Sequence, residues 1–468
     1  FEGIDTGEGG AAFLGLPYAE PPLGERRWAA PLPWRASGGT RSAMRFAPGC
    51  LQDERMVSWY RELIGVFGGD PGAFPAPGFS EDCLYLNVWR PETRAGQKLP
   101  VLVWIHGGSN TGGWSSEPNY AGKFLAREGL VVVTIAYRLG VFGTFSLPGL
   151  PQSNFGLLDQ IEALRWVRAH IAAFGGDASR VTVAGESAGA SNIAHLLASP
   201  RAEGLFHRAI MQSGGYALRS RARREDGFER GLALAGALGL RAGDDPLAAL
   251  RAAAADRVLS AAARVYPEQD FDPVVDGDTV PVPTAERIAA GHLARVPLLI
   301  GSNGDEWRMY LEASLDEAAW IRTNAPGQEA AIAGALSGIQ DPLRRLDLLE
   351  TANLFVCPSL WLAAQVHQQG SRAFVYHFTR VREGAGGERI GAYHGAEIPY
   401  VFGTHDAWLP TTADDRGLGE RLMAYWRNFA ASGDPNGRGL PIWPAWDAQS
   451  SRTMRLDRTD APLPHPSA

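Results

Sequence analysis

Residues 181–190 read Val-Thr-Val-Ala-Gly-Glu-Ser-Ala-Gly-Ala, a setting that favours a serine nucleophile. A β-branched run at 181–183 precedes the Gly-x-Ser-x-Gly pattern at 185–189, and a helix-compatible stretch at 190–197 follows it. A tight turn from strand to helix strains the backbone of such a serine and projects its hydroxyl from the top of a sheet. Gly185 and Gly189 suit this turn because a Cβ at either position would clash with a neighbouring strand or helix. We therefore expect Ser187 to be a nucleophile, facing the free N–H groups of a helix start.

A serine nucleophile needs a general base, and the base needs a carboxylate that orients it. Among ten histidines, His394 is the strongest candidate for the base, because it lies in a glycine-flanked loop after the apolar run 374–377. Glu306 is the candidate carboxylate, because it follows the apolar run 296–300 and active residues gather at the C-terminal ends of strands. Asp305 is its rival, and Asp276 is a weaker one.

A glycine-rich turn could supply N–H groups to an oxyanion. Trp-Ile-His-Gly-Gly-Ser at 104–109 follows an apolar run that begins at Val101. Donors of this kind usually come from such a turn together with the N–H after the nucleophile. The turn and the serine motif would be neighbours at one edge of a sheet, so each strengthens the other.

The elements that must position these residues alternate along the chain. Apolar runs typical of buried strands occur at 101–105, 130–136, 181–183, 209–211, 296–300 and 374–377. Residues 159–174 carry apolar side chains at 161, 164, 167 and 171, which form one face of a helix. This alternation predicts an α/β fold with a mainly parallel sheet and helices on both of its faces.

We interpret residues 1–468 as a single domain, since no repeat or low-complexity linker divides them. The first hundred residues are rich in proline and glycine and favour short strands and loops. Residues 222–263 and 313–369 are helix-like and lie between sheet strands. They predict cap-like helical insertions at about 215–290 and about 307–370.

The composition excludes several classes of function. The net charge is −7, which argues against a nucleic-acid partner. No apolar stretch approaches the roughly 18–20 residues that span a bilayer. The three cysteines form no Cys-x-x-Cys pair, so we expect no zinc–thiolate site, no other metal and no organic cofactor. Because the first residue is Phe1, either a leader has been removed or preceding residues are missing from this sequence.

Taken together, the chain resembles the type-B carboxylesterase/lipase family, which includes cholinesterases, animal carboxylesterases and bacterial p-nitrobenzyl-type esterases. The matching motifs run nearly from end to end in one order: 13–22, 80–87, 104–108, 154–190, 271–277, 301–306, 394–402 and 432–436. The resemblance implies an α/β-hydrolase fold and a serine hydrolase of small-molecule carboxylic esters.

Carried over residue by residue, the resemblance implies Ser187 as nucleophile, Glu306 as acid and His394 as base. The choice of Glu306 over Asp305 rests on the family pattern. By the same resemblance, the N–H groups of Gly108, Ser109 and Ala188 form the oxyanion hole, and Gly107 shapes the turn. The family usually has Gly or Ala where this chain has Ser109. The backbone donor survives, while the extra hydroxyl either donates a further bond or narrows the pocket, and the tolerance of bulky alcohol groups depends on it.

The resemblance also implies a disulfide between Cys50 and Cys83, which would close a loop over the substrate entrance. Such a bridge implies an oxidising compartment, so we expect a secreted or periplasmic protein. Aromatic residues of that loop either line the entrance or pack the loop onto the core: Trp59, Tyr60, Phe67 and Phe74. Cys357 is then unpaired, and we expect it to be a buried small apolar residue.

Two further residues, Glu186 and Ser213, have two interpretations each, and a third, Glu397, has one. Glu186 either tunes the electrostatics of the site or serves as a carboxylate at a helix start. Ser213 resembles a family serine that bonds the acid, although a turn role is usual at a strand end. Glu397 lies one turn beyond His394, and we expect it to be structural.

Two alternatives to a carboxylesterase remain at this point. A lipase would act on long acyl chains at an interface, and turnover of soluble short-chain esters against emulsified triglycerides separates it from an esterase. A catalytically silent adhesion protein of the cholinesterase type would lack the nucleophile, whereas this chain retains Ser187, Glu306 and His394.

Overall fold

The computed structural model describes residues 1–7, 9–36, 38–94, 96–241, 243–268, 270–311 and 315–463. Within them, eleven strands form one sheet in the order β1-β2-β5-β7-β6-β8-β9-β10-β11-β12-β13. Their bounds are β1 (Ile4–Gly7), β2 (Gly10–Pro17), β5 (Tyr85–Arg90), β6 (Leu99–Ile105), β7 (Val131–Ile135), β8 (Gly176–Glu186), β9 (Arg208–Gln212), β10 (Leu298–Asn303), β11 (Ala373–Phe378), β12 (Thr453–Leu456) and β13 (Ala461–Leu463).

The seven strands from β7 to β12 in this order are parallel, whereas β1, β2, β5 and β13 pair antiparallel at the two sides. In the register, Ile105 pairs with Gly185, and Glu186 pairs with Gln212 on the next strand. The carboxyl ends of β6, β8 and β9 therefore meet at one edge of the sheet. The expected α/β fold with a mainly parallel sheet is confirmed.

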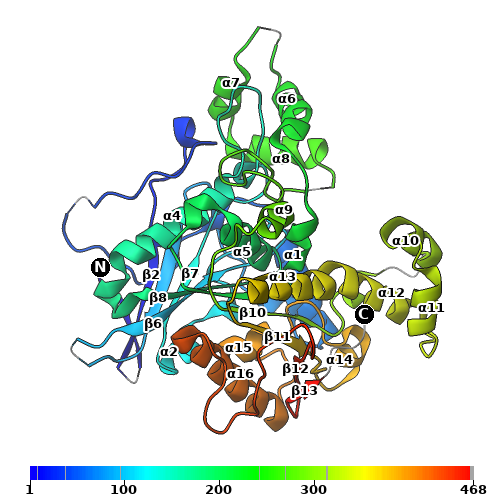
Figure 1. Cartoon of the computed structure of the whole chain (residues 1–468). Coiled ribbons are helices and arrows are strands. Elements are labelled where there is room, and N and C mark those ends of the chain that lie inside the picture. The colour runs from blue at the N-terminus through cyan, green and yellow to red at the C-terminus, as the bar shows by residue number, and fades with distance from the viewer. Residues whose placement is uncertain are drawn as a thin grey trace.

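Helices cover both faces of the sheet (Figure 1). On one face lie α4 (Phe155–His170), α5 (Ala188–Ala198) and α13 (Cys357–Gln368); on the other lie α2 (Lys123–Arg127), α15 (Ile398–Phe402) and α16 (Ala413–Ser432). Alternate strand residues serve the two faces, because successive side chains of a strand point in opposite directions. Val101 and Val103 join the core under α4 and α5, whereas Leu102 and Trp104 join the core under α16.

Two groups of helices stand away from the sheet (Figure 1). One contains α6 (Phe228–Ala237), α7 (Pro246–Ala252) and α8 (Ala255–Val265), and the other contains α10 (Glu317–Asn324), α11 (Glu329–Ala335) and α12 (Pro342–Thr351). They fall within the two predicted insertions, whose residues 242, 269 and 312–314 lie outside the described residues. Two shorter helices are α9 (Thr284–Ala289), which packs on α5, and α14 (Ala385–Ile390).

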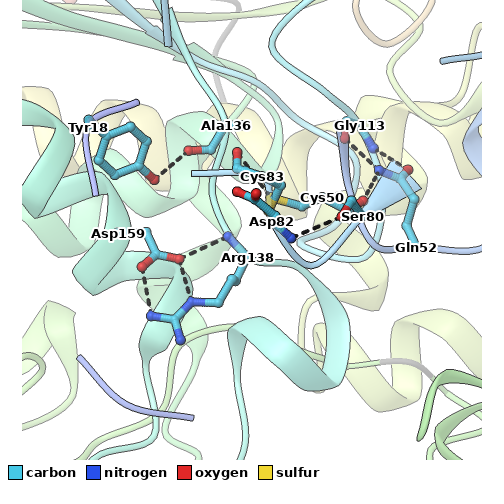
Figure 2. Close-up of a disulfide and its surroundings, with 10 residues drawn as sticks. All are labelled: Tyr18, Cys50, Gln52, Ser80, Asp82, Cys83, Gly113, Ala136, Arg138 and Asp159. Atoms are coloured by element: carbon cyan, nitrogen blue, oxygen red, sulfur yellow. Dashed lines mark hydrogen bonds and ion pairs between the residues drawn. A yellow bond between two sulfur atoms is a disulfide. The ribbon is translucent and has the colours of Figure 1, made fainter. Parts of the chain in front are cut away.

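The first hundred residues contain a helix that the sequence interpretation missed. α1 (Arg55–Val66) buries Val57, Tyr60, Leu63 and Ile64 on one face, a helical spacing hidden among prolines and glycines. A disulfide joins Cys50, at the end of β3 (Gly49–Cys50), to Cys83, which confirms the predicted bridge (Figure 2). The two cysteines lie at the two ends of the loop that carries α1. β3 pairs with β4 (Phe79–Ser80) near these ends.

Cys357 corrects another expectation, because it is exposed rather than buried. It begins α13 and directly precedes Pro358, and its side chain lies on the outer side of the helix while Phe355 and Ser359 face inward.

In the described part of the chain, no helix is long and apolar enough to cross a membrane.

Candidate active site

Ser187 lies between β8 and α5 in a conformation that few non-glycine residues adopt. Its φ is 53° and its ψ is −123°, and its side chain is buried apart from 8% of its surface. Such strain persists only where the surroundings over-determine the backbone. The Ser187 N–H donates to the carbonyl of Gln212 at 2.9 Å, and its own carbonyl accepts from Ser191 N at 2.9 Å. The predicted turn from strand to helix is therefore held from both sides.

Glycines surround this turn because the neighbouring strand comes very close. A Cβ on Gly185 would lie 2.7 Å from the carbonyl oxygen of Ile105, and one on Gly189 would overlap the same oxygen. A Cβ on Gly107 would lie 3.0 Å from the Ser187 Cβ. The glycine-rich turn after β6 thus packs directly on the serine turn, as the sequence predicted.

His394 and Glu306 meet although 88 residues separate them. The two side chains are joined by His394 Nδ1 and Glu306 Oε2 at 2.6 Å. A proton on Nδ1 that is donated to Glu306 leaves Nε2 free to accept a proton, which is what a general base requires. Glu306 follows β10, His394 lies in the loop after α14, and both loops rise at the same edge of the sheet as Ser187.

The Glu306 carboxylate is fully buried and held by further donors. Ser213 Oγ and Asn303 N each donate to Glu306 Oε1 at 2.6 Å. The two rival carboxylates make other contacts. Asp305 pairs with Arg344 and accepts a hydrogen bond from Ala392 N. Asp276 accepts hydrogen bonds from Asn154 and from backbone N–H groups of its own turn. The structure therefore brings Glu306, and neither of its rivals, to His394.

A second carboxylate faces the other nitrogen of His394. Glu186 Oε1 lies 3.3 Å from His394 Nε2. Burial raises the pKa of Glu186 to about 8, although His394 opposes the rise. Burial by itself would lower the pKa of His394, but Glu186 and Glu306 outweigh it and raise that pKa to about 9. Glu186 therefore contacts the site rather than only capping a helix.

The turn after β6 adopts an unusual run of backbone conformations. Gly108, Ser109 and Asn110 have φ values of 100°, 54° and 54°. The carbonyl of Gly108 accepts from the N–H groups of Thr111 and Gly112, both at 2.9 Å. Gln52, two residues beyond the disulfide, donates to Gly113 O at 2.8 Å and accepts from Gly113 N at 2.9 Å (Figure 2). Ala188, the third predicted donor, is the buried first residue of α5.

Ser187 and His394 open on a cavity of about 580 Å³. Gly107, Gly108 and Ser109 form part of its wall. α1 contributes Trp59 and Tyr60, so these two aromatics line the cavity, whereas Phe74 packs the loop onto Tyr60 and Trp114. Phe67 packs against Tyr393 and Trp408. Both interpretations of the loop aromatics therefore hold, each for different residues.

The sequence interpretation did not assign several residues of the cavity to the site, although Phe271 begins one of the matching family segments. They are aromatic side chains that come from segments outside the serine, histidine and glycine motifs: Tyr216, Phe271, Trp307, Tyr310 and Phe355. Phe355 belongs to a single π-helical turn (Ala352–Val356) between α12 and α13, and its ring lies 5.3 Å from the His394 ring. A π turn inside a helix often marks a functional site, but no residue type announces it.

Glu397 is fully buried below this site. It accepts from Gln212 Nε2 at 2.8 Å and from Asn303 Nδ2 at 2.6 Å. These bonds tie the loop of His394 to the ends of β9 and β10, which fits the structural role expected for it.

The chain matches a known protein family over most of its length. A family model described as "Carboxylesterase family" matches residues 2–332 and 338–465. The chain is 35% identical to fumonisin B1 esterase of Sphingopyxis macrogoltabida, over 93% of this chain and 81% of the relative. It is also 35% identical to cocaine esterase of Homo sapiens, over 95% of this chain and 83% of the relative.

Solved structures resemble the chain over nearly its whole length. A PNB esterase superposes with a TM-score of 0.82 at 32% identity, covering 99% of this chain and 96% of the other. A thermophilic PNB esterase superposes with a TM-score of 0.84 at 32% identity, covering 98% and 95%.

Proposed function

Since the chain belongs to the carboxylesterase family and is a serine carboxylesterase, we propose that Ser187, His394 and Glu306 are the catalytic triad of its ester hydrolysis. The observation that carries the proposal is the 2.6 Å contact between the buried Glu306 and His394, which lines the same cavity as Ser187. Asp305 and Asp276 make other contacts, so Glu306 is the acid that the geometry favours.

In this mechanism, His394 takes the proton of Ser187 as the serine oxygen attacks the ester carbonyl. Glu306 holds the imidazole in the tautomer with Nδ1 protonated and stabilises the imidazolium that forms. The protonated His394 then gives its proton to the departing alcohol. Water, activated by the same histidine, attacks the acyl-enzyme and releases the acid.

The negative charge of the tetrahedral intermediate is stabilised by the N–H groups of Gly108, Ser109 and Ala188. Gly107 packs against Ser187, which supports this assignment because it sets the glycine-rich turn beside the nucleophile. Loss of one such donor lowers the rate by about 10²–10³-fold in comparable sites. Ser213 is a positioning residue because it donates a hydrogen bond to Glu306. Glu397 is a positioning residue because it bonds the strand ends that carry the site.

The test is hydrolysis of p-nitrophenyl butyrate by Ser187→Ala, with Ser260→Ala as control. Ser260 lies on the exposed side of α8 and bonds only its own helix, so the control keeps wild-type turnover. We expect Ser187→Ala to lose at least about 10³-fold in kcat. Wild-type turnover by Ser187→Ala would refute the triad.

The two curated relatives are named for different esters, so neither name fixes the substrate of this chain. The cavity of about 580 Å³ is lined mainly by aromatic and apolar residues, which favours small-molecule esters with a compact acyl group. Faster turnover of p-nitrophenyl butyrate than of emulsified triglyceride supports an esterase; the reverse would favour the lipase alternative.

We further propose that residues 1–468 act as one catalytic domain, with the helix groups α6–α8 and α10–α12 as cap-like insertions beside the cavity. The Cys50–Cys83 bridge supports an oxidising, extracellular or periplasmic location.

A further inference from the structure

The backbone after Gly108 is held in a conformation that its residues do not prefer. Ser109 and Asn110 both have φ near 54°. For residues with a side chain, the left-handed region costs about 1–2 kcal/mol, and asparagine tolerates it best. The N–H of Ser109 changes direction if this region of the backbone relaxes, so something must hold the two residues in place.

The Asn110 side chain supplies that hold. It is 94% buried, with 6% of its surface exposed. Its Nδ2 donates to Asp272 Oδ1 at 2.8 Å, and its Oδ1 accepts from Asn192 Nδ2 at 2.8 Å. Its backbone carbonyl also accepts from Gly140 N at 2.7 Å. Every bond acts on the residue that directly follows Ser109.

The chemistry of the acceptor fixes the direction of this chain of bonds. A carboxylate only accepts hydrogen bonds, so Asn110 must turn its NH₂ group toward Asp272. Its carbonyl oxygen must then face Asn192, which must present its own NH₂ group. Burial, and then the neighbouring Asp270, raise the pKa of Asp272 to about 6, so Asp272 is an anionic acceptor at neutral pH. A bond to a charged acceptor is stronger than a neutral one.

The two partners of Asn110 lie in two other segments of the site, helix α5 and the cavity wall beside Phe271. Asn192 is 1% exposed and lies on α5, the helix whose first residue is Ala188. Asp272 lies in the cavity wall, and its neighbour Phe271 is anchored by Thr144 Oγ1 at 2.8 Å. The path Asp272–Asn110–Asn192 therefore connects the turn of Gly108 and Ser109 with the helix of Ala188.

We propose that Asn110 is a positioning residue for ester hydrolysis, held by Asp272 and Asn192 so that the Ser109 N–H stays directed at the oxyanion. The inference rests on the oxyanion hole proposed above. Asn110 does not touch the ester itself; it acts through the backbone of Ser109. It should therefore affect the stabilisation of the transition state and leave substrate binding nearly unchanged.

The first test is Asn110→Gly. Glycine adopts a φ of 54° freely, so the variant removes the side-chain bonds without forcing the backbone. We expect kcat for p-nitrophenyl butyrate to fall on the order of tenfold, with KM changed less than about twofold. Affinity for a trifluoromethyl ketone, which forms a tetrahedral oxyanion with the serine, should fall in parallel. A rise in KM with unchanged kcat, or unchanged inhibitor affinity, would overturn the proposal.

A second pair of variants tests the positioning role of Asn110 even if Asn110→Gly fails to fold. Asp272→Ala removes the acceptor, whereas Asp272→Asn keeps an oxygen that can accept from Asn110. We expect Asp272→Ala to lose kcat on the order of tenfold and Asp272→Asn to retain most of it. Asp278→Ala is the control, because Asp278 pairs with Arg201 in the same segment but outside the site. Equal kcat in Asp272→Ala, Asp272→Asn and wild type would overturn the proposal.

Activities of Ser187→Ala and Asn110→Gly together distinguish a failure of the positioning role from a failure of the proposed triad. An inactive Ser187→Ala together with a fully active Asn110→Gly refutes only the positioning role. An active Ser187→Ala refutes the catalytic mechanism on which the inference rests.

Discussion

His394 lies between two carboxyl groups, and we expect the second, Glu186, to influence the pH at which the proposed base becomes available. Its Nδ1 contacts Glu306 at 2.6 Å, and its Nε2 lies 3.3 Å from Glu186. In the proposed triad, Nε2 is the nitrogen that accepts the proton of Ser187. The protonated histidine gains from both carboxylates, which is why its pKa rises to about 9 despite burial. Glu186 thus stabilises the form of His394 that cannot act as a base.

The first prediction concerns Glu186→Gln. Removal of this negative charge favours neutral imidazole, so the pKa of His394 falls. The acidic limb of the pH profile of kcat/KM reports the free base, and it should move to lower pH. The measurement is kcat/KM for p-nitrophenyl butyrate from pH 5 to pH 9.5. Glu203→Gln, at an exposed position, is the control and keeps the wild-type profile. An unmoved limb in Glu186→Gln would show that Glu186 does not stabilise the imidazolium.

The residues that carry motifs could be predicted, and the others could not, for a physical reason. Ser187 and Gly107 lie in turns that demand particular residue types, so the local sequence reveals them. Tyr216 and Phe355 reach the cavity only through the packing of distant segments. An aromatic residue in a helix is usual for any core, so its type gives no sign of the site. The exposed position of Cys357 was missed for the same reason, since helix orientation decides it.

At the scale of elements, the turn between β8 and α5 depends on how closely β6 approaches it. The carbonyl of Ile105 occupies the space where Cβ atoms of Gly185 and Gly189 would lie. The sequence predicted this strand–turn–helix unit because short-range patterns define it. It missed α1, whose four buried residues have helical spacing but lie in a segment dominated by loop-forming residues. It also began one strand early, at 296, whereas β10 begins at Leu298.

The second prediction is that Gly189→Ala destabilises the protein and nearly abolishes activity. The new Cβ would overlap backbone, which cannot move aside as a flexible side chain can. Overpacking of this kind typically costs about 1–3 kcal/mol. The matched control is Gly236→Ala in α6, where no atom lies within 4 Å of the new Cβ. Alanine there should be neutral or stabilising, because glycine weakens a helix interior. Thermal unfolding and turnover of both variants provide the measurement; equal melting temperatures would contradict the prediction.

The third prediction concerns the Cys50–Cys83 bridge, which ties down the segment that carries α1. Trp59 and Tyr60 of α1 line the cavity. Gln52 makes two hydrogen bonds to the backbone of Gly113 (Figure 2). Replacement of both cysteines by serine should cost about 2–4 kcal/mol of stability, because the unfolded chain gains freedom. It should also raise KM more than it lowers kcat, since the wall of the cavity loosens. Cys357→Ser, at an exposed free cysteine, is the control and should match wild type. A double variant with wild-type melting temperature and KM would contradict the prediction.

At the scale of the whole molecule, carboxyl groups outnumber cationic groups around the cavity. Five carboxyl groups line it: Asp53, Glu117, Glu186, Asp270 and Asp272. Burial raises the pKa of Glu117 to about 7 and that of Glu186 to about 8, so Asp270 and Asp272 carry most of the unpaired negative charge at neutral pH. The cationic side chains of the wall are Arg55, which is paired with Asp53, and His394, whose pKa is raised to about 9 and which faces Glu186. The whole chain carries a net charge of −7, so the surroundings do not offset this field. A cleft lined by one sign of charge concentrates ligands of the opposite sign and repels those of the same sign.

The last prediction follows from this field. Among p-nitrophenyl esters of equal length, an ester whose acyl chain ends in a carboxylate should be the poorest substrate. We expect kcat/KM for the succinate monoester to be at least about tenfold below that for the butyrate ester, mainly through KM. An ester of a trimethylammonium-substituted acid should equal or exceed the butyrate. Because salt screens such fields over about 10 Å at 0.1 M ionic strength and about 3 Å at 1 M, the difference should shrink as salt is raised. Equal kcat/KM for the anionic and neutral esters at low salt would show that the carboxylates are neutralised and do not select the substrate.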